Sequence, residues 1–421
     1  MKRLKNRLYH FLRWSEKYTK TDMVFAISTG WWAVVAQLAT SISAFALSLV
    51  LAHLVNKEAY GTYQYILSIM SMLSILTLTG IGNAVTQSVA RGHDQSLQDG
   101  FRLNMRWSFG VLVGTGALVI YYVLHQNYAL GIAILIAGLT TPLRTSFNLY
   151  GSFLGGKKDN RRSALYTNGI GNVAPMIMIA LAAFFTNSGV LLAIAYSIGN
   201  LVTAAYLYIR TIRDYQPLAR DHDSDLRSYS FHLSAAGILN TVAGNLDNLL
   251  LFHYLGPTDV AIYNFAIALP DQTKGPLGSV GTMLTARFAG HSPEAIHGSM
   301  RNKIKWLAII HVLMVALLII IIPPFYHFFF STYTASIPYA QLYTLSLLAT
   351  IFMPMSAYLT AHKHVREQYL YTIFSSVFQI GALFVGVLTA GLLGIVIARI
   401  VARIISWLVL AGLYRNTVAR R

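Results

Sequence analysis

The sequence predicts an all-α polytopic membrane protein with about twelve transmembrane helices in two six-helix lobes and with both termini in the cytoplasm. Three observations support this prediction: a low content of charge, a series of apolar segments and a one-sided distribution of basic residues. Of the 421 residues, 55% are hydrophobic and only 11% are charged, whereas soluble domains carry about 25% charged residues. So little charge cannot cover a water-facing surface, which excludes a soluble enzyme, a disordered protein and a nucleic-acid-binding domain.

The chain begins with a basic segment, 1–20, that is rich in Lys and Arg. Its apolar residues recur at the spacing of one helical face, namely Leu4, Leu8, Phe11 and Leu12. We therefore expect a short amphipathic helix that lies on the anionic cytoplasmic leaflet. A frayed basic tail is the alternative interpretation.

Apolar segments of roughly the 20 residues needed to span a bilayer make up most of the remaining chain. Their predicted boundaries are 26–54, 61–89, 106–125, 128–153, 164–186, 190–211, 231–255, 259–288, 304–330, 334–361, 368–390 and 392–414. The basic connection 212–230 is the longest, and it divides the chain into an N-terminal lobe, 21–211, and a C-terminal lobe, 231–421.

A weak internal repeat supports this division into lobes. A shift of 200 residues aligns four residues of the first lobe (Leu49, Leu51, His53 and Tyr63) with identical residues of the second (Leu249, Leu251, His253 and Tyr263). An even number of helices in each half gives a parallel repeat, and such transporters bind substrate between the halves. The repeat therefore favours a transporter.

The basic residues predict the orientation. The chain has 32 Lys and Arg residues, and 27 of them fall in the N-terminal segment or in the connections and C-terminus on the same side of the predicted helices. By the positive-inside bias, that side and both termini face the cytoplasm. The net charge of +17 is thus a topology signal, and nucleic acid is not an expected partner.

Six ionisable residues lie deep in the predicted spans, where charge is costly and usually functional. The cations are Arg144, Lys274, Arg399 and Arg403, and the acids are Asp247 and Asp271. The positive sum suits an anionic, phosphate-bearing substrate, so these four cations are the predicted substrate-binding residues.

Arg399 and Arg403 are four residues apart and share a helix face. Two guanidinium groups on one face offer two donor forks to phosphate oxygens. The alternative is that they reach the inner headgroups or pair with an acid inside the bundle. Arg144 follows Pro142 in a kinked span, and its alternative role is a structural ion pair.

Asp247, flanked by Asn245 and Asn248, is the predicted ion-coupling residue. Carboxylate and amide oxygens can hold Na⁺, or the carboxylate can accept a proton. The alternative is a carboxylate satisfied by neighbouring amides or by an arginine. Asp271 can pair with Lys274 three residues later. The pair is either a salt-bridged hinge, or it releases Lys274 to bind phosphate during transport. Asp271, Asn245 and Asn248 are predicted ion-coupling residues together with Asp247.

No cofactor or metal site is predicted, apart from H⁺ or Na⁺ as a coupling ion. Cysteine is absent, and no histidine pair has a metal-motif context. The stretch 155–158 lacks the leading glycine and the spacing of a phosphate-binding Walker loop. The outer loops are short and carry no acid–base pair, so we do not expect an enzyme.

Several short motifs resemble the polysaccharide flippase family (Wzx-type, RfbX-like) of the multidrug/oligosaccharidyl-lipid/polysaccharide (MOP) exporter superfamily. The first helix pair carries Leu51-Ala-His-Leu-Val, Glu58-Ala-Tyr-Gly61-Thr-Tyr63, Gly80-Ile-Gly82-Asn-Ala-Val and Ala90-Arg91. The middle carries Asp247-Asn-Leu-Leu-Leu, Tyr254-Leu-Gly256-Pro and Val260-Ala-Ile-Tyr263, and the end carries Gly391-Leu-Leu-Gly394-Ile-Val-Ile-Ala. The likeness extends over essentially the whole chain.

The resemblance implies a two-lobed, MATE-like exporter of the cytoplasmic membrane that moves undecaprenyl-diphosphate-linked oligosaccharide to the outer leaflet. It implies alternating access coupled to H⁺ or Na⁺, with Asp247 at the family's recurrent acidic position. Expected partners are the lipid-linked substrate, membrane lipids, a polysaccharide polymerase and chain-length proteins. The alternatives are a multidrug exporter of the same superfamily, against which the positive sum argues, and a membrane-embedded polymerase or glycosyltransferase.

Overall fold

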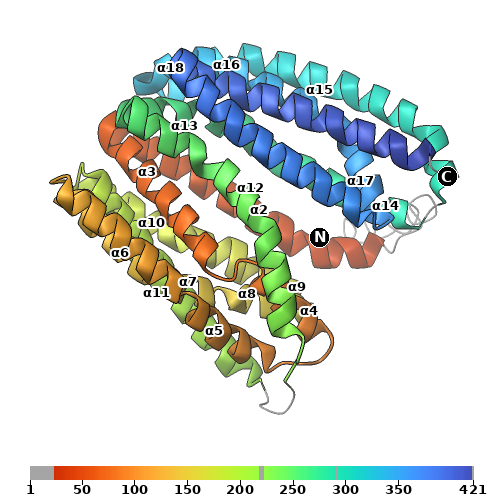
Figure 1. The fold of residues 1–421 in the computed structure, drawn as a ribbon, viewed down its shortest axis with the longest axis horizontal. Coiled ribbons are helices and arrows are strands. Elements are labelled where there is room, and N and C mark those ends of the chain that lie inside the picture. The colour runs from red at the N-terminus through yellow and green to blue at the C-terminus, as the bar shows by residue number, and fades with distance from the viewer. Residues whose placement is uncertain (1–22, 218–221, 291, 420–421) are drawn as a thin grey trace, which may run out of the picture. The chain divides into compact units, whose positions relative to one another are not determined.

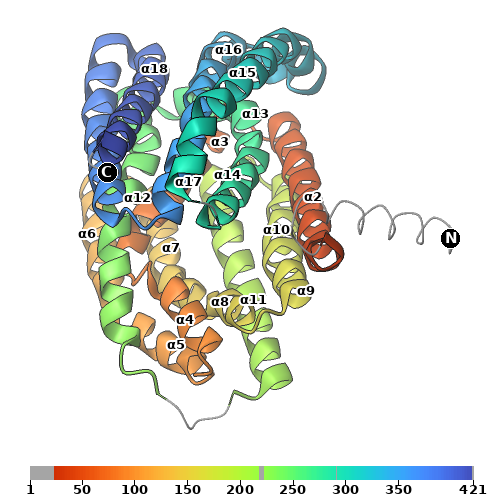
Figure 2. The ribbon, with the colours of Figure 1, turned by 90° about the vertical axis from the view of Figure 1, so that its right-hand side faces the viewer.

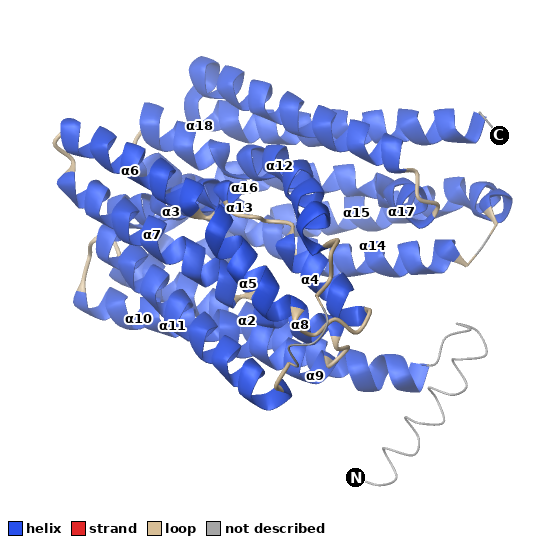
Figure 3. Ribbon diagram, turned by 60° about the horizontal axis from the view of Figure 1, so that its bottom comes forward, coloured by secondary structure: helices blue, strands red, loops and turns tan. Residues whose placement is uncertain are grey.

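The computed structural model describes residues 23–217, 222–290 and 292–419 (Figure 1). Within these ranges the chain is helical and contains no strand (Figure 3). The basic segment 1–20 lies outside the described residues, so its amphipathic helix stays a prediction.

The helices follow one another closely along the chain. In order they are α2 (Met23–Leu54), α3 (Lys57–Leu73), η1 (Ser74–Leu76), α4 (Ile81–Ala90), α5 (Ser96–Trp107), α6 (Phe109–Leu124), α7 (Tyr128–Phe147), α8 (Leu149–Gly156), α9 (Asn160–Ser163), η2 (Ala164–Ile170), α10 (Gly171–Phe185), α11 (Gly189–Tyr215), α12 (Leu226–Tyr254), α13 (Pro257–Gln272), α14 (Lys274–Ala289), α15 (Pro293–Phe329), η3 (Ser331–Ser336), α16 (Ile337–Thr344), η4 (Leu345–Phe352), α17 (Met353–Ala361) and α18 (Val365–Ala419).

The described helices confirm a multi-pass, all-helical membrane protein. Eight of them, some formed from consecutive elements, are long and apolar enough to cross a membrane, and a bent pair raises this number to nine. Many large apolar side chains are exposed, among them Phe185 at 89% and Phe328 at 79%. Such a surface suits lipid and would aggregate in water. The full count of twelve spans and the cytoplasmic termini stay predictions.

One predicted span is broken in the structure. Segment 61–89 forms α3 and α4, which are bent by 57° across a break of four residues or fewer. At the break, the amide of Gly80 donates a hydrogen bond to Oγ of Ser234 at 2.9 Å. A Cβ at position 80 would lie 2.5 Å from Cβ of Leu233. The sequence pattern missed the bend because a glycine inside an apolar run gives no sign of which helix it contacts.

The last two predicted spans form a hairpin within α18. The chain reverses at Ala390 and Gly391, and Gly391 has φ +56° and ψ −129°, a conformation that glycine adopts without steric cost. After the turn, a Cβ at Gly394 would lie 1.9 Å from the carbonyl oxygen of Gly386. Two glycines thus let the two halves of α18 approach closely.

The described residues form two compact units. Unit 1 contains the residues up to 50 together with 76–186 and 191–235, and unit 2 contains 51–75, 187–190 and 236–421. The predicted lobe boundary lies close to residue 235, but 51–75 groups with the C-terminal half. The reason is a close helix contact, because a Cβ at Gly61 of α3 would lie 1.7 Å from the carbonyl oxygen of Pro257 on α13.

Each unit has its own apolar core. In unit 1, α4, α5, α8 and α11 bury Leu97, Phe153 and Leu207 completely. In unit 2, α12, α13 and α18 bury Leu251 and Ile395, while α14 runs beside α17 and α15 beside α16 (Figure 2). The core of unit 2 also encloses polar side chains.

Candidate functional site

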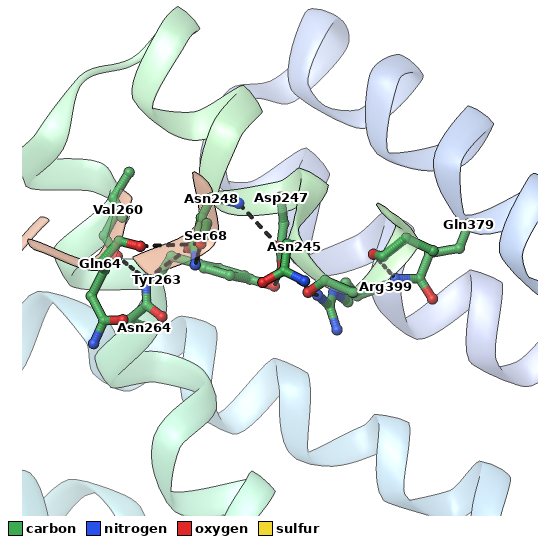
Figure 4. A network of polar contacts seen from close by, with 12 residues as sticks. Gln64, Ser68, Asn245, Asp247, Asn248, Val260, Tyr263, Asn264, Gln379 and Arg399 are labelled. Atoms are coloured by element: carbon green, nitrogen blue, oxygen red, sulfur yellow. Dashed lines mark hydrogen bonds and ion pairs between the residues drawn. The ribbon is translucent and has the colours of Figure 1, made fainter. Parts of the chain in front are cut away.

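Asp247 is the centre of a buried polar network in unit 2 (Figure 4). Its side chain on α12 is 2% exposed, and one carboxylate oxygen accepts hydrogen bonds from Nη2 of Arg399 and from the hydroxyl of Tyr263. The other oxygen accepts from the amide of Asn248 at 3.0 Å. Arg399, on the second half of α18, also donates to the carbonyl of Gly244 at 3.0 Å. Three helices therefore meet at one carboxylate.

The contacts of Asp247 bear on two interpretations of the sequence. Arg399 was a predicted phosphate ligand with an internal ion pair as its alternative, and the structure places it in the ion pair. Its side chain is 12% exposed, and its Nε is buried with no hydrogen-bond partner among the described residues. Breaking a buried ion pair by removing one partner costs about 3–5 kcal/mol. Asp247 and Arg399 must therefore be charged together or neutralised by another group.

Arg403 lies one turn further along α18 and belongs to a second polar group. Its Nη1 donates to Oγ of Ser346 at 2.9 Å, and its guanidinium carbon lies 5.3 Å from the ring centre of Tyr343. The side chain of Tyr343 is hydrogen-bonded to Asp271 on α13. Asp271 and Arg403 thus share Tyr343 as a contact. The predicted pairing of Asp271 with Lys274 involves a side chain that the structure does not describe.

The charges of the described site residues in unit 2 balance, whereas the six ionisable residues predicted deep in the spans carry a positive sum. In the described part of the site, Arg399 and Arg403 accompany Asp247 and Asp271. The predicted excess of positive charge therefore rests on Lys274, whose side chain is not described, and on Arg144, which belongs to unit 1. Nε of Arg144 on α7 is buried and has no hydrogen-bond partner within the described ranges.

The side chains of the two asparagines next to Asp247 do not converge on it, and only that of Asn248 contacts other helices. Nδ2 of Asn248 donates to Oγ of Ser68 on α3 at 2.9 Å, and its Oδ1 accepts from Nδ2 of Asn264 on α13 at 2.8 Å. Nδ2 of Asn245 donates to the carbonyl of Thr241 at 2.8 Å. The amide of Asn248 therefore joins α3, α12 and α13. The described residues contain no cluster of three or more His, Cys, Asp or Glu side chains that could hold a metal ion.

Sequence reasoning missed the tyrosines and one glutamine of the site. Tyr263 entered only as a position of the repeat and of a motif shared with the family, and Tyr343 and Gln379 were not singled out. Nε2 of Gln379 donates to the carbonyl of Ala243 at 2.7 Å, which fixes the first half of α18 on α12. The available signal was the internal repeat, since it marked Tyr263 one helix after Asp247 in a region with several polar residues.

Comparison with known proteins agrees with the predicted family. The family described as polysaccharide biosynthesis protein matches residues 28–270. No curated protein matches the sequence.

Solved transporter structures share the fold. An inward-facing multidrug resistance MATE family transporter of the MOP superfamily has a TM-score of 0.71 at 14% identity, over 92% of this chain and 98% of that one. The lipid II flippase MurJ, in an inward closed conformation, has a TM-score of 0.69 at 16% identity, over 90% and 86%.

A MOP superfamily transporter from Pyrococcus furiosus, reported with a binding pocket of reverse polarity, has a TM-score of 0.62 at 15% identity, over 94% and 95%. These likenesses show the fold of MOP transporters, and the family match covers more than half of the chain. The chain belongs to the polysaccharide biosynthesis protein family.

Proposed function

We propose that this protein is a flippase that moves undecaprenyl-diphosphate-linked oligosaccharide from the cytoplasmic to the outer leaflet of the cytoplasmic membrane. Its family is one of polysaccharide biosynthesis, its helices are those of a multi-pass membrane protein, and its fold is shared with a flippase of lipid II. We include in this proposal twelve spans, cytoplasmic termini and alternating access between two lobes. A polysaccharide polymerase and chain-length proteins would act on the product at the outer side.

The buried ion pair between Asp247 and Arg399 carries the mechanism. When Asp247 binds a proton, its carboxyl group no longer balances the guanidinium charge. An ion pair between Arg399 and another anion within reach then becomes favourable. A phosphate oxygen of the substrate is such an anion, and a guanidinium group binds it through two N–H donors. Protonation and substrate binding would thus favour each other, which is the differential affinity that coupling requires.

Arg403 extends this site along the same face of α18. Side chains four residues apart on a helix have Cβ atoms about 5–6 Å apart, a spacing that suits the two phosphate groups of a diphosphate. Asp271 would balance the charge of Arg403 when no substrate is bound, a role supported by the contacts of both residues with Tyr343. We assign Lys274 and Arg144 to the same substrate as further cations along its path.

A proton fits the coupling role better than Na⁺. A sodium site would need the oxygens of Asn245, Asp247 and Asn248 to surround one point. The oxygen of Asn248 instead accepts a hydrogen bond from Asn264, and Asp247 already accepts from Arg399 and Tyr263.

The function is tested in proteoliposomes that hold a fluorescent undecaprenyl-diphosphate-linked oligosaccharide, with its transfer between leaflets measured by access of a quencher. Replacing Arg399 and Arg403 together by Gln removes both phosphate donors, so we expect transfer to fall to the rate of protein-free vesicles. The matched control is Arg415→Gln, an exposed arginine of the same helix, which should transfer at the wild-type rate.

The same vesicles separate the alternatives. Transfer of lipid-linked substrate at the wild-type rate by the double variant would overturn the assigned site. Accumulation of a cationic dye, with no transfer of the lipid-linked oligosaccharide, would instead favour a multidrug exporter, since the MATE transporters share this fold. Elongation of the oligosaccharide would favour a polymerase.

A further inference from the structure

An open cavity with both polar and apolar lining residues lies in unit 1. Its volume is about 520 Å³, and it is lined by Trp107 of α5 and by Ser224, Arg227, Ser228, Phe231 and His232 from the end of the linker and the start of α12. None of these residues belongs to the proposed substrate site. By the positive-inside bias, they lie at the cytoplasmic membrane surface.

The residues from α12 that line the cavity share one helical face. They recur at intervals of three and four residues, which is the spacing of a single face. The opposite face is buried, with Leu226 5% exposed and Ser230 fully covered. The start of α12 thus has a buried side, packed inside unit 1, and a side that presents a cation, one hydroxyl group, an imidazole and an aromatic ring to the cavity; Ser224 adds a second hydroxyl group from the linker.

Polar contacts hold the back of this segment in place. Asp223 forms an ion pair with Arg91 at 2.6 Å, and the hydroxyl of Tyr229 accepts a hydrogen bond from Nε2 of Gln87 at 2.7 Å. One turn later, Ser234 accepts from the amide of Gly80 at 2.9 Å. The cavity wall is therefore fixed on α4 and on the bend before it.

Among the described acids of the segment, each is either paired or absent from the cavity lining. Asp223 is paired with Arg91, and Asp99 contacts Nδ1 of His222 at 2.7 Å. Asp225 is exposed and does not line the cavity. The described residues give Arg227 no carboxylate partner, so its charge is available to a ligand.

The aromatic residues indicate that this ligand has an apolar part. The rings of Trp107 and Phe231 lie 4.9 Å apart in an edge-to-face contact, and their side chains are 40% and 47% exposed. Tryptophan and phenylalanine at a membrane surface contact the upper part of acyl chains, while basic pockets between transmembrane helices on the cytoplasmic side hold lipid phosphates.

We propose that this cavity binds the phosphate group of an anionic membrane amphiphile, with Arg227, His232 and the two serines on the phosphate and the two aromatic rings on the chain. Two amphiphiles share this chemistry: an anionic phospholipid and an undecaprenyl diphosphate. The site does not depend on the proposed flipping, because binding is measured without transport.

The test uses the full chain in detergent. Binding of dioctanoyl phosphatidylglycerol, dioctanoyl phosphatidylcholine and undecaprenyl diphosphate is measured separately by native mass spectrometry and by the shift in melting temperature. We expect an anionic probe to bind and phosphatidylcholine to bind at least tenfold more weakly, because phosphatidylcholine carries the same phosphate together with a trimethylammonium cation, which the positive charge of Arg227 repels. Binding of phosphatidylglycerol would assign the site to a membrane lipid, and selective binding of undecaprenyl diphosphate would assign it to loading of the carrier.

Three variants make the test specific. Arg227→Gln together with His232→Gln should weaken binding of the anionic probe at least tenfold. Trp107→Ala should weaken binding of undecaprenyl diphosphate more than binding of inorganic phosphate, which is measured as a fourth probe. Arg106→Gln removes the same charge one residue away from Trp107, at an exposed position outside the lining, and should bind as the wild type does. Equal losses for Arg106→Gln and for the double variant, or equal binding of phosphatidylcholine and phosphatidylglycerol, would overturn the proposal.

Discussion

The two units treat charge inside the membrane-spanning helices differently. In unit 2, Asp247 is bound by an arginine and a tyrosine, and Arg403 is held by a serine and an aromatic ring. In unit 1, Arg144 makes no ion pair with another described residue, and its Nε, like that of Arg399, is buried without a hydrogen-bond partner in the described ranges. A paired charge stabilises the fold and must be released to act, whereas an unpaired one is costly to keep and ready for a ligand.

This difference predicts that removal of Asp247 is the most damaging single change to stability. In Asp247→Ala, Arg399 keeps its charge in a buried position without an anion, so we expect a loss of about 3–5 kcal/mol in the free energy of unfolding. The measurement is the loss of folded protein in detergent on titration with a denaturant. The double variant Asp247→Ala/Arg399→Leu, which removes both charges, should recover most of this loss. A double variant no more stable than the single one would show that the pair is not the cause.

A second large loss of stability is expected where the backbones of two helices are in direct contact. In Gly61→Ala, the new methyl group would overlap the carbonyl of Pro257, at 1.7 Å, and α3 would have to move away from α13. Overpacking typically costs about 1–3 kcal/mol. Gly116→Ala on α6 is the matched control, since nothing lies within 4 Å of its added methyl group; it should be neutral or stabilise by up to about 1 kcal/mol. Equal stability of the two variants would contradict the close contact.

Arg144 should behave in the opposite way to Asp247. Because Arg144→Gln breaks no ion pair among the described residues, we expect a change of less than about 1 kcal/mol in the free energy of unfolding. We expect a clear loss of transfer in proteoliposomes, since this cation is assigned to the substrate. Transfer at the wild-type rate would remove Arg144 from the substrate path. Severe unfolding would indicate a structural role.

The smallest effect is expected at the membrane surface of unit 1. Burial raises the pKa of Asp223, but hydrogen bonds from Ser88, Arg91 and the amide of Asp225 outweigh it, and the net shift is downward. A lowered pKa in the folded state stabilises the protein above the ordinary aspartate pKa of about 3.9, and this contribution is lost as the pH falls through the folded-state pKa. Because Arg91 is 54% exposed, Arg91→Gln should cost at most about 1 kcal/mol at neutral pH and less in acid, measured by unfolding at pH 7 and pH 3. An equal cost at both values would contradict the pairing.

Composition and periodicity were sufficient to predict the fold class, since a chain with so little charge and so many apolar segments has few other solutions. They could not predict the bend at Gly80 or the grouping of residues 51–75 with unit 2, because both depend on which helix a glycine contacts. The positions of Asp247 and Arg399 were found, since charge in an apolar span is conspicuous. Their pairing was not determined by the sequence, because they are 152 residues apart and only the packing of α12 on α18 joins them.

The exchange of partners by Arg399 is the central claim, and Asp247→Asn tests it most directly. This variant keeps the shape of the side chain but can no longer change charge on binding a proton. Transfer of the fluorescent lipid-linked oligosaccharide is followed in proteoliposomes with and without an imposed pH gradient. We predict that the gradient accelerates transfer by the wild type and leaves the Asn variant unchanged, while both still bind the substrate. Transfer by Asp247→Asn with the wild-type dependence on the gradient would contradict the claim and leave Asp247 as a structural partner of Arg399.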